Sequence, residues 1–157
     1  MKKVEERTFW EVYYNPTLNI FEVYWKKTVR ETGEVEMEEE EFKEYLLNFL
    51  KLLPQYRVDG FITDTREYHY LMGIDLQEWH DQVIAPQYLA NNLKKIIFIM
   101  KKEFLVTSLS IKQAFSEENS NNLQVLYTEG WEEARSVFMK NDENKPTKPY
   151  LFYEAKG

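Results

Sequence analysis

The chain has 157 residues, a formal net charge of -7 and no cysteine, and this length predicts one domain with a core of its own. The missing cysteines exclude disulfides, thiolate metal sites and cysteine nucleophiles. The acidic balance argues against nucleic acid and anionic membrane surfaces as partners. No apolar run approaches the ~20 residues of a membrane span, and no apolar stretch follows the first lysines as in a signal peptide. We therefore expect a cytoplasmic protein.

The first part of the chain predicts a hairpin, a helix and a buried strand. Residues 8–14 and 20–25 are rich in aromatic and β-branched residues and flank a turn with asparagine and proline, which is typical of an antiparallel hairpin. Apolar residues at helical spacing over residues 42–53 predict a helix, and Pro54 is expected to end it. Residues 61–64 then read as a short buried strand.

A second helix is predicted to begin at residue 75. Asp75, with a glutamate three residues later, is typical of the capping box that begins a helix. Leu76, Trp79 and Val83 follow at helical spacing and predict its inner face. Pro86 should kink or split this helix, because proline lacks a backbone donor and its ring clashes with the preceding turn.

The remaining sequence continues the alternation of strands and helices. The unbroken apolar run at residues 96–100 is typical of a central strand that is covered on both faces. Three further elements are predicted: a helix at 104–115, a strand at 123–127 and a last helix capped by Thr128.

This order predicts an α/β fold with a mixed sheet of about five strands, opening with an antiparallel hairpin and with helices packed on it. Residues 1–139 are expected to form a single domain. Residues 140–157 read as a polar linker and a short aromatic C-terminal tail. The aromatic hairpin or the tail could seat a homodimer.

Several framework features occur together along residues 10–139. They are Tyr-Asn-Pro-x-x-Asn-Ile-x-x-Val-x-Trp at 14–25, Asp64-Thr65-Arg66 at a strand end, a helix with Trp79 and Pro86, Leu93-Lys94-Lys95 before an apolar strand, and Trp131-Glu132-Glu133-Ala134. In these features the chain resembles the SpoIIAA-like or STAS-like domains. The resemblance implies a sheet of four to six strands with helices mainly on one side. It also implies a regulatory role through partner binding, since the better-known members are bacterial anti-sigma-factor antagonists.

The chain departs from this family at the regulatory switch. Family members carry a serine at the start of the second helix, in an Asp-Ser-Ser-Gly-like stretch that a partner kinase phosphorylates. The corresponding stretch here, residues 71–76, reads Leu-Met-Gly-Ile-Asp-Leu and has neither serine nor threonine. The resemblance therefore implies the scaffold and the partner binding, but not the phosphoserine switch.

Ionisable and aromatic residues gather after the strand that ends at Asp64, where ligands commonly bind in α/β sheets. A general acid or base could come from one of two histidines here. We expect no catalytic residue, because Asp64 and Arg66 can pair, Asp75 can cap a helix and His80 can lie at the core boundary. The histidine spacing and the scattered glycines predict no metal and no cofactor. The candidate binding residues are Asp64, Arg66, Tyr68, His69, Tyr70, Leu71, Met72, Asp75, Trp79 and His80.

Two functions follow from these observations. The first is a non-enzymatic regulatory or protein-interaction module, whose unidentified protein partner docks on the second helix and on residues 66–74. The alternative is a small apolar-ligand-binding domain, with a pocket under the 66–74 loop and the 75–92 helix. A pocket lined by Trp25, Trp79, Tyr70 or Phe104 would support the alternative.

Overall fold

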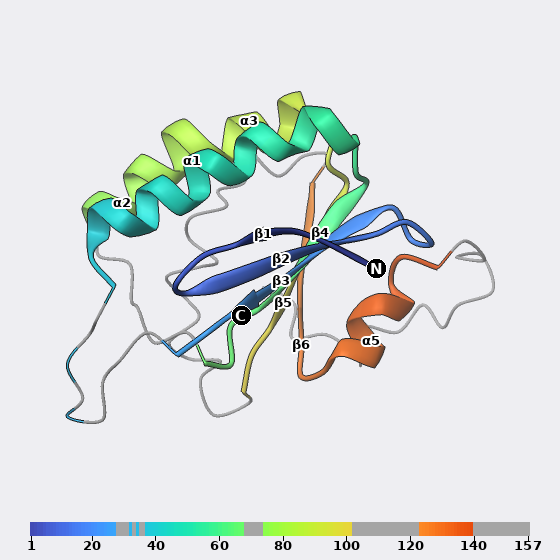
Figure 1. Ribbon diagram of the computed structural model, residues 1–157. Helices are drawn as coiled ribbons and strands as arrows, with labels where there is room; N and C mark the ends of the chain where they lie inside the picture. The colour runs from blue at the N-terminus through green and yellow to red at the C-terminus, as the bar shows by residue number, and fades with distance from the viewer. Residues whose placement is uncertain (28–31, 33, 35–36, 68–73, 102–122, 140–157) are drawn as a thin grey trace.

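The computed structural model describes residues 1–27, 32, 34, 37–67, 74–101 and 123–139. Within these residues, six strands form one sheet in the order β1-β2-β3-β4-β5-β6 (Figure 1). They are β1 (Lys2–Glu6), β2 (Trp10–Asn15), β3 (Ile20–Trp25), β4 (Gly60–Asp64), β5 (Lys95–Ile99) and β6 (Gln124–Thr128). The first three strands pair antiparallel and β3 to β6 pair parallel. The mixed α/β sheet that opens with a hairpin is therefore confirmed.

Strand β1 is one strand more than the five predicted. It pairs antiparallel with β2, with a bulge between Lys3 and Glu5. Its sequence, Lys-Lys-Val-Glu-Glu, has a single apolar residue and so carries no strand signal. Charged side chains and a bulge are what protect an edge strand from pairing with other chains. The charged residues that give β1 no strand signal in the sequence therefore suit its position at the edge of the sheet.

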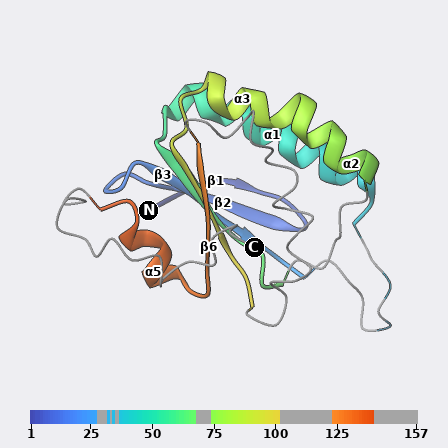
Figure 2. The ribbon, with the colours of Figure 1, turned by 180° about the vertical axis from the view of Figure 1, so that it is seen from behind.

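Two helical layers cover the sheet from opposite sides. Helix α1 (Glu39–Tyr56) and the segment α2 (Ile74–Trp79), η1 (His80–Ile84) and α3 (Ala85–Ala90) lie side by side over one face. The short helix α5 (Trp131–Ser136) lies on the other face. Both views show this arrangement (Figures 1 and 2). Most of the described helical residues thus pack on one side, as expected.

Pro54 does not end α1, which continues to Tyr56. A proline in the last turn removes only one backbone hydrogen bond, and packing of the last turn offsets that loss. The Tyr56 ring lies 4.9 Å from Tyr14 and 5.2 Å from Phe21. The helix ends one residue later, where Arg57 takes a left-handed conformation and its N–H donates to a backbone oxygen of the last turn.

Asp75 lies inside the first turn of α2 and does not cap it. The second helix is interrupted next to Pro86, as predicted. Residues His80–Ile84 form η1, a turn of π-helix, and Pro86 lies in the first turn of α3. The extra residue in the π turn changes which side chains of the second helix face the sheet. His80 and Tyr88 are buried, whereas Val83, predicted to face inward, is 38% exposed.

The core has two separate parts. Rings from β2, β3 and α1 fill the larger part; Trp10 lies 4.9 Å from Trp25 and 5.7 Å from Phe49. The smaller part lies between the sheet and α5. Its buried members are Ile20, Ile62, Ile97, Ile99, Leu126, Ala134 and Val137. Strand β5 contributes side chains to both parts and is covered on both faces, as the sequence predicts.

Two positions at the ends of strands show how closely the elements approach. A side chain at Gly60 would collide with the backbone carbonyl of Lys95, so only glycine fits where β4 begins beside β5. Thr128 does not cap the last helix. It ends β6, and α5 begins after Gly130.

Some expectations fall on other parts of the chain. The predicted helix at 104–115 and the linker and tail at 140–157 lie outside the described residues. Among the helices that the structure describes, none is long and apolar enough to cross a membrane.

Candidate functional site

A buried carboxylate lies between the sheet and α5. Glu22, on β3, is 0% exposed. Arg135, on α5, donates to its two oxygens from Nε at 2.8 Å and from Nη2 at 2.7 Å. The Asn15 side-chain amide donates at 3.0 Å and the Tyr24 hydroxyl at 3.3 Å. Burial acts to raise the pKa of Glu22, but the hydrogen bonds from Arg135 and Asn15 outweigh it and hold this pKa below its usual range.

A second carboxylate lies at the end of β4. Three groups of Arg66 donate hydrogen bonds to Asp64: Nε at 2.9 Å, Nη2 at 2.7 Å and the backbone N–H at 3.1 Å. The indole N–H of Trp131 donates to Asp64 at 2.9 Å. Burial acts to raise the pKa of Asp64, but the hydrogen bonds from Arg66 and Trp131 lower this pKa by more than burial raises it. The pKa of Asp64 therefore lies below its usual range. The predicted pairing of Asp64 with Arg66 is confirmed.

Aromatic contacts join the two carboxylate groups. The Trp131 ring stacks on Tyr24 with centroids 4.5 Å apart, and the Arg135 guanidinium lies 5.0 Å from the Trp131 ring centre. Burial, followed by the nearby charge of Glu22, raises the pKa of the Tyr24 hydroxyl to about 12. A general base needs a pKa near the working pH, and these groups are shifted away from it. The cluster is built to fasten α5 to the sheet.

The described candidate residues do not converge on one cleft. Asp64 and Arg66 lie together on the α5 side of the sheet. His80 lies on the other side, buried, with its ring 6.2 Å from Tyr88. Trp79 packs half-buried against the large core, and Asp75 is exposed. The remaining candidates, Tyr68, His69, Tyr70, Leu71 and Met72, lie outside the described residues.

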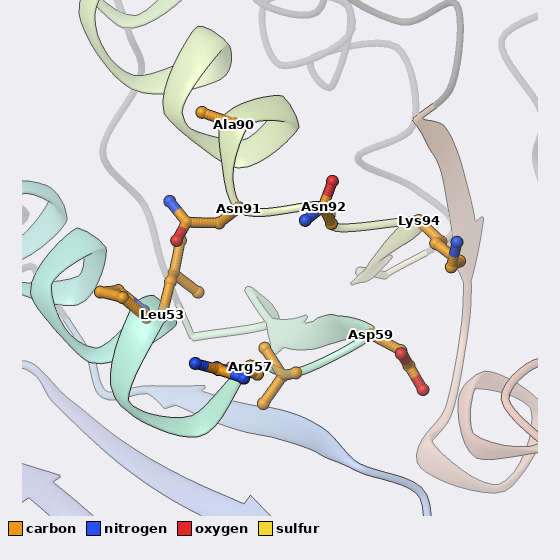
Figure 3. A pocket seen from close by; sticks show the side chains of 9 residues that line it. Leu53, Arg57, Asp59, Ala90, Asn91, Asn92 and Lys94 are labelled. Carbon is orange, nitrogen blue, oxygen red and sulfur yellow. The ribbon is translucent and has the colours of Figure 1, made fainter.

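A pocket with a volume of about 430 Å³ lies where α1 and α3 end (Figure 3). It is at the amino ends of β4 and β5, whereas α/β sheets usually bind ligands at the carboxyl ends. Its rim carries charges of both signs, from the exposed residues Arg57, Asp59 and Lys94. It is lined by Leu53, Pro54, Arg57, Val58, Asp59, Ala90, Asn91, Asn92 and Lys94. This mixture selects no particular ligand charge.

A second groove, of about 710 Å³, runs along the exposed side of α1 and is bordered by Trp79, the last residue of α2. Its apolar side chains are Leu47, which is 42% exposed, and the half-buried Trp79. Lys43 lies 5.2 Å from the Trp79 ring centre. The groove is lined by Glu40, Lys43, Glu44, Leu47, Asn48, Lys51 and Trp79. It borders the second helix, where the sequence placed a binding surface.

Within the described ranges, no three histidine, aspartate or glutamate side chains are grouped to hold a metal ion. Comparison with known proteins finds no family model, no curated protein and no solved structure that matches this chain. The function must therefore be argued from the geometry of the molecule itself.

Sequence reasoning missed both the fastening cluster and the groove. Glu22 interrupts an apolar strand, and a glutamate there is a signal that a basic partner lies opposite it. The partner, Arg135, is 113 residues away in the chain, so spacing alone could not identify it. Leu47 sits at the outward side of a helix, and only the position of the neighbouring helix turns it into part of a groove.

Proposed function

We propose that the chain is a non-enzymatic, cytoplasmic protein-interaction module of the STAS-like kind, working without the phosphoserine switch. Its docking surface is the groove along α1 that Trp79 of α2 borders. The observation that carries the proposal is an exposed Leu47 beside a half-buried Trp79 in a groove of about 710 Å³. A tryptophan at the wall of a groove is a common anchor of protein interfaces.

The state of the carboxylates near α5 supports a binding role over catalysis. Glu22 and Asp64 are each satisfied by a guanidinium and by further donors. Such carboxylates have no lone pair left to accept a proton from a substrate, because every carboxylate oxygen already accepts hydrogen bonds. Pairs of this kind hold elements of the fold together. Their arrangement holds the scaffold and leaves the opposite face of the molecule to bind.

The alternative function stays a prediction. An apolar ligand under the second helix would need space behind its inner face, yet Leu76, Ile84 and Tyr88 are each 2% exposed or less and pack into the core. Residues 68–73, part of the 66–74 loop under which the pocket is predicted, lie outside the described residues. Trp25 is buried against Tyr45 and Phe42, so a ligand pocket would have to form elsewhere.

A crosslinking experiment tests the docking surface. A photoreactive amino acid is placed at Leu47, and a matched one at Met139, which is 48% exposed and follows α5 on the opposite face. We expect a protein that crosslinks from position 47 in cells and not from position 139. Excess wild-type chain should compete for it, and so should the Met139→Glu variant, whereas the Leu47→Glu variant should not.

The control variants make the outcome specific. Leu47→Glu and Met139→Glu add the same charge at similarly exposed positions. A protein captured equally from both positions contradicts the docking surface. So does a partner that the Leu47→Glu variant competes for as well as wild type, because the groove would then contribute nothing to binding.

A further inference from the structure

We draw no further inference here: the strongest candidate, the groove along α1 that Trp79 of α2 borders, belongs to the docking surface already proposed, its lining residues carry balanced charges, and nothing in the described part of the chain shows what covers it.

Discussion

The two faces of the sheet are held by different forces. On the face under α1, large rings pack against one another, and apolar burial dominates. On the face under α5, a small aliphatic cluster is joined by two carboxylate–guanidinium pairs and a stacked tryptophan. Apolar burial is insensitive to pH, whereas the ionic side depends on the charge of a few groups. The comparison separates the part of the fold that is robust from the part that responds to solution conditions.

The largest expected effect comes from removing a ring on the α1 side. Phe49 is 1% exposed and lies 5.5 Å from Phe21 and 4.9 Å from Phe61. Phe49→Ala should lower the free energy of unfolding by about 3–5 kcal/mol, since it leaves a cavity among rings. Chemical denaturation measures the loss. Phe49→Leu, which keeps most of the volume, should cost less than half as much; equal costs would mean that this core is loosely packed.

The next effect comes from the buried ion pair on the α5 side. Arg135→Ala leaves Glu22 charged and buried, and we expect a loss of about 2–3 kcal/mol, below the full cost of a broken buried pair because Arg135 is partly exposed. Arg66→Ala should cost less, because Asp64 keeps the Trp131 donor. The double variant Glu22→Gln/Arg135→Met should recover part of the loss. Denaturant unfolding of all three checks this order.

The pH dependence distinguishes the two faces further. The pKa values of Glu22 and Asp64 are both lowered in the fold. Each group therefore contributes stability that is complete above its unfolded-state pKa of about 4 and is lost as the pH falls through its folded-state pKa.

We expect Glu22→Gln to be less stable than wild type at pH 7 and to approach wild type at pH 3. Phe49→Ala should keep most of its deficit at both pH values. Thermal unfolding at the two pH values tests this, and a Glu22→Gln deficit that is the same at both would contradict the ionic account of the α5 side.

The smallest effect comes from one hydrogen bond. Trp131→Phe keeps an aromatic ring on Tyr24 but removes the indole N–H that donates to Asp64. The expected loss is about 1 kcal/mol, the usual size of one hydrogen bond in a fold. If the variant loses as much as Arg135→Ala, stacking and volume at this position matter more than the hydrogen bond.

The elements that the sequence located correctly are those with strong local signals. Ile20–Trp25, the strand ending at Asp64 and the apolar strand β5 are dense in β-branched and aromatic residues, and each forms a strand. Pro86 interrupts a helix because its missing N–H and its ring act within one turn. The pairing of Asp64 with Arg66 is also local, because two residues of separation bring the guanidinium within reach.

The features that the sequence missed depend on partners far along the chain. Charged β1 becomes a strand only because β2 offers its backbone. The inner face of the second helix follows a π turn, so Val83 points outward and His80 inward. Spacing cannot anticipate that turn.

What the sequence by itself determined is the α/β class, the hairpin, the central strands and the lack of any cysteine in these 157 residues. Local propensity and periodicity suffice for these. What only the tertiary structure decided is which polar residues are buried together and which apolar residues line a groove. Glu22 meets Arg135 because α5 packs on the face of the sheet that carries Glu22. Leu47 borders the same groove as Trp79 because α1 and α2, which are separate in the chain, pack on the other face.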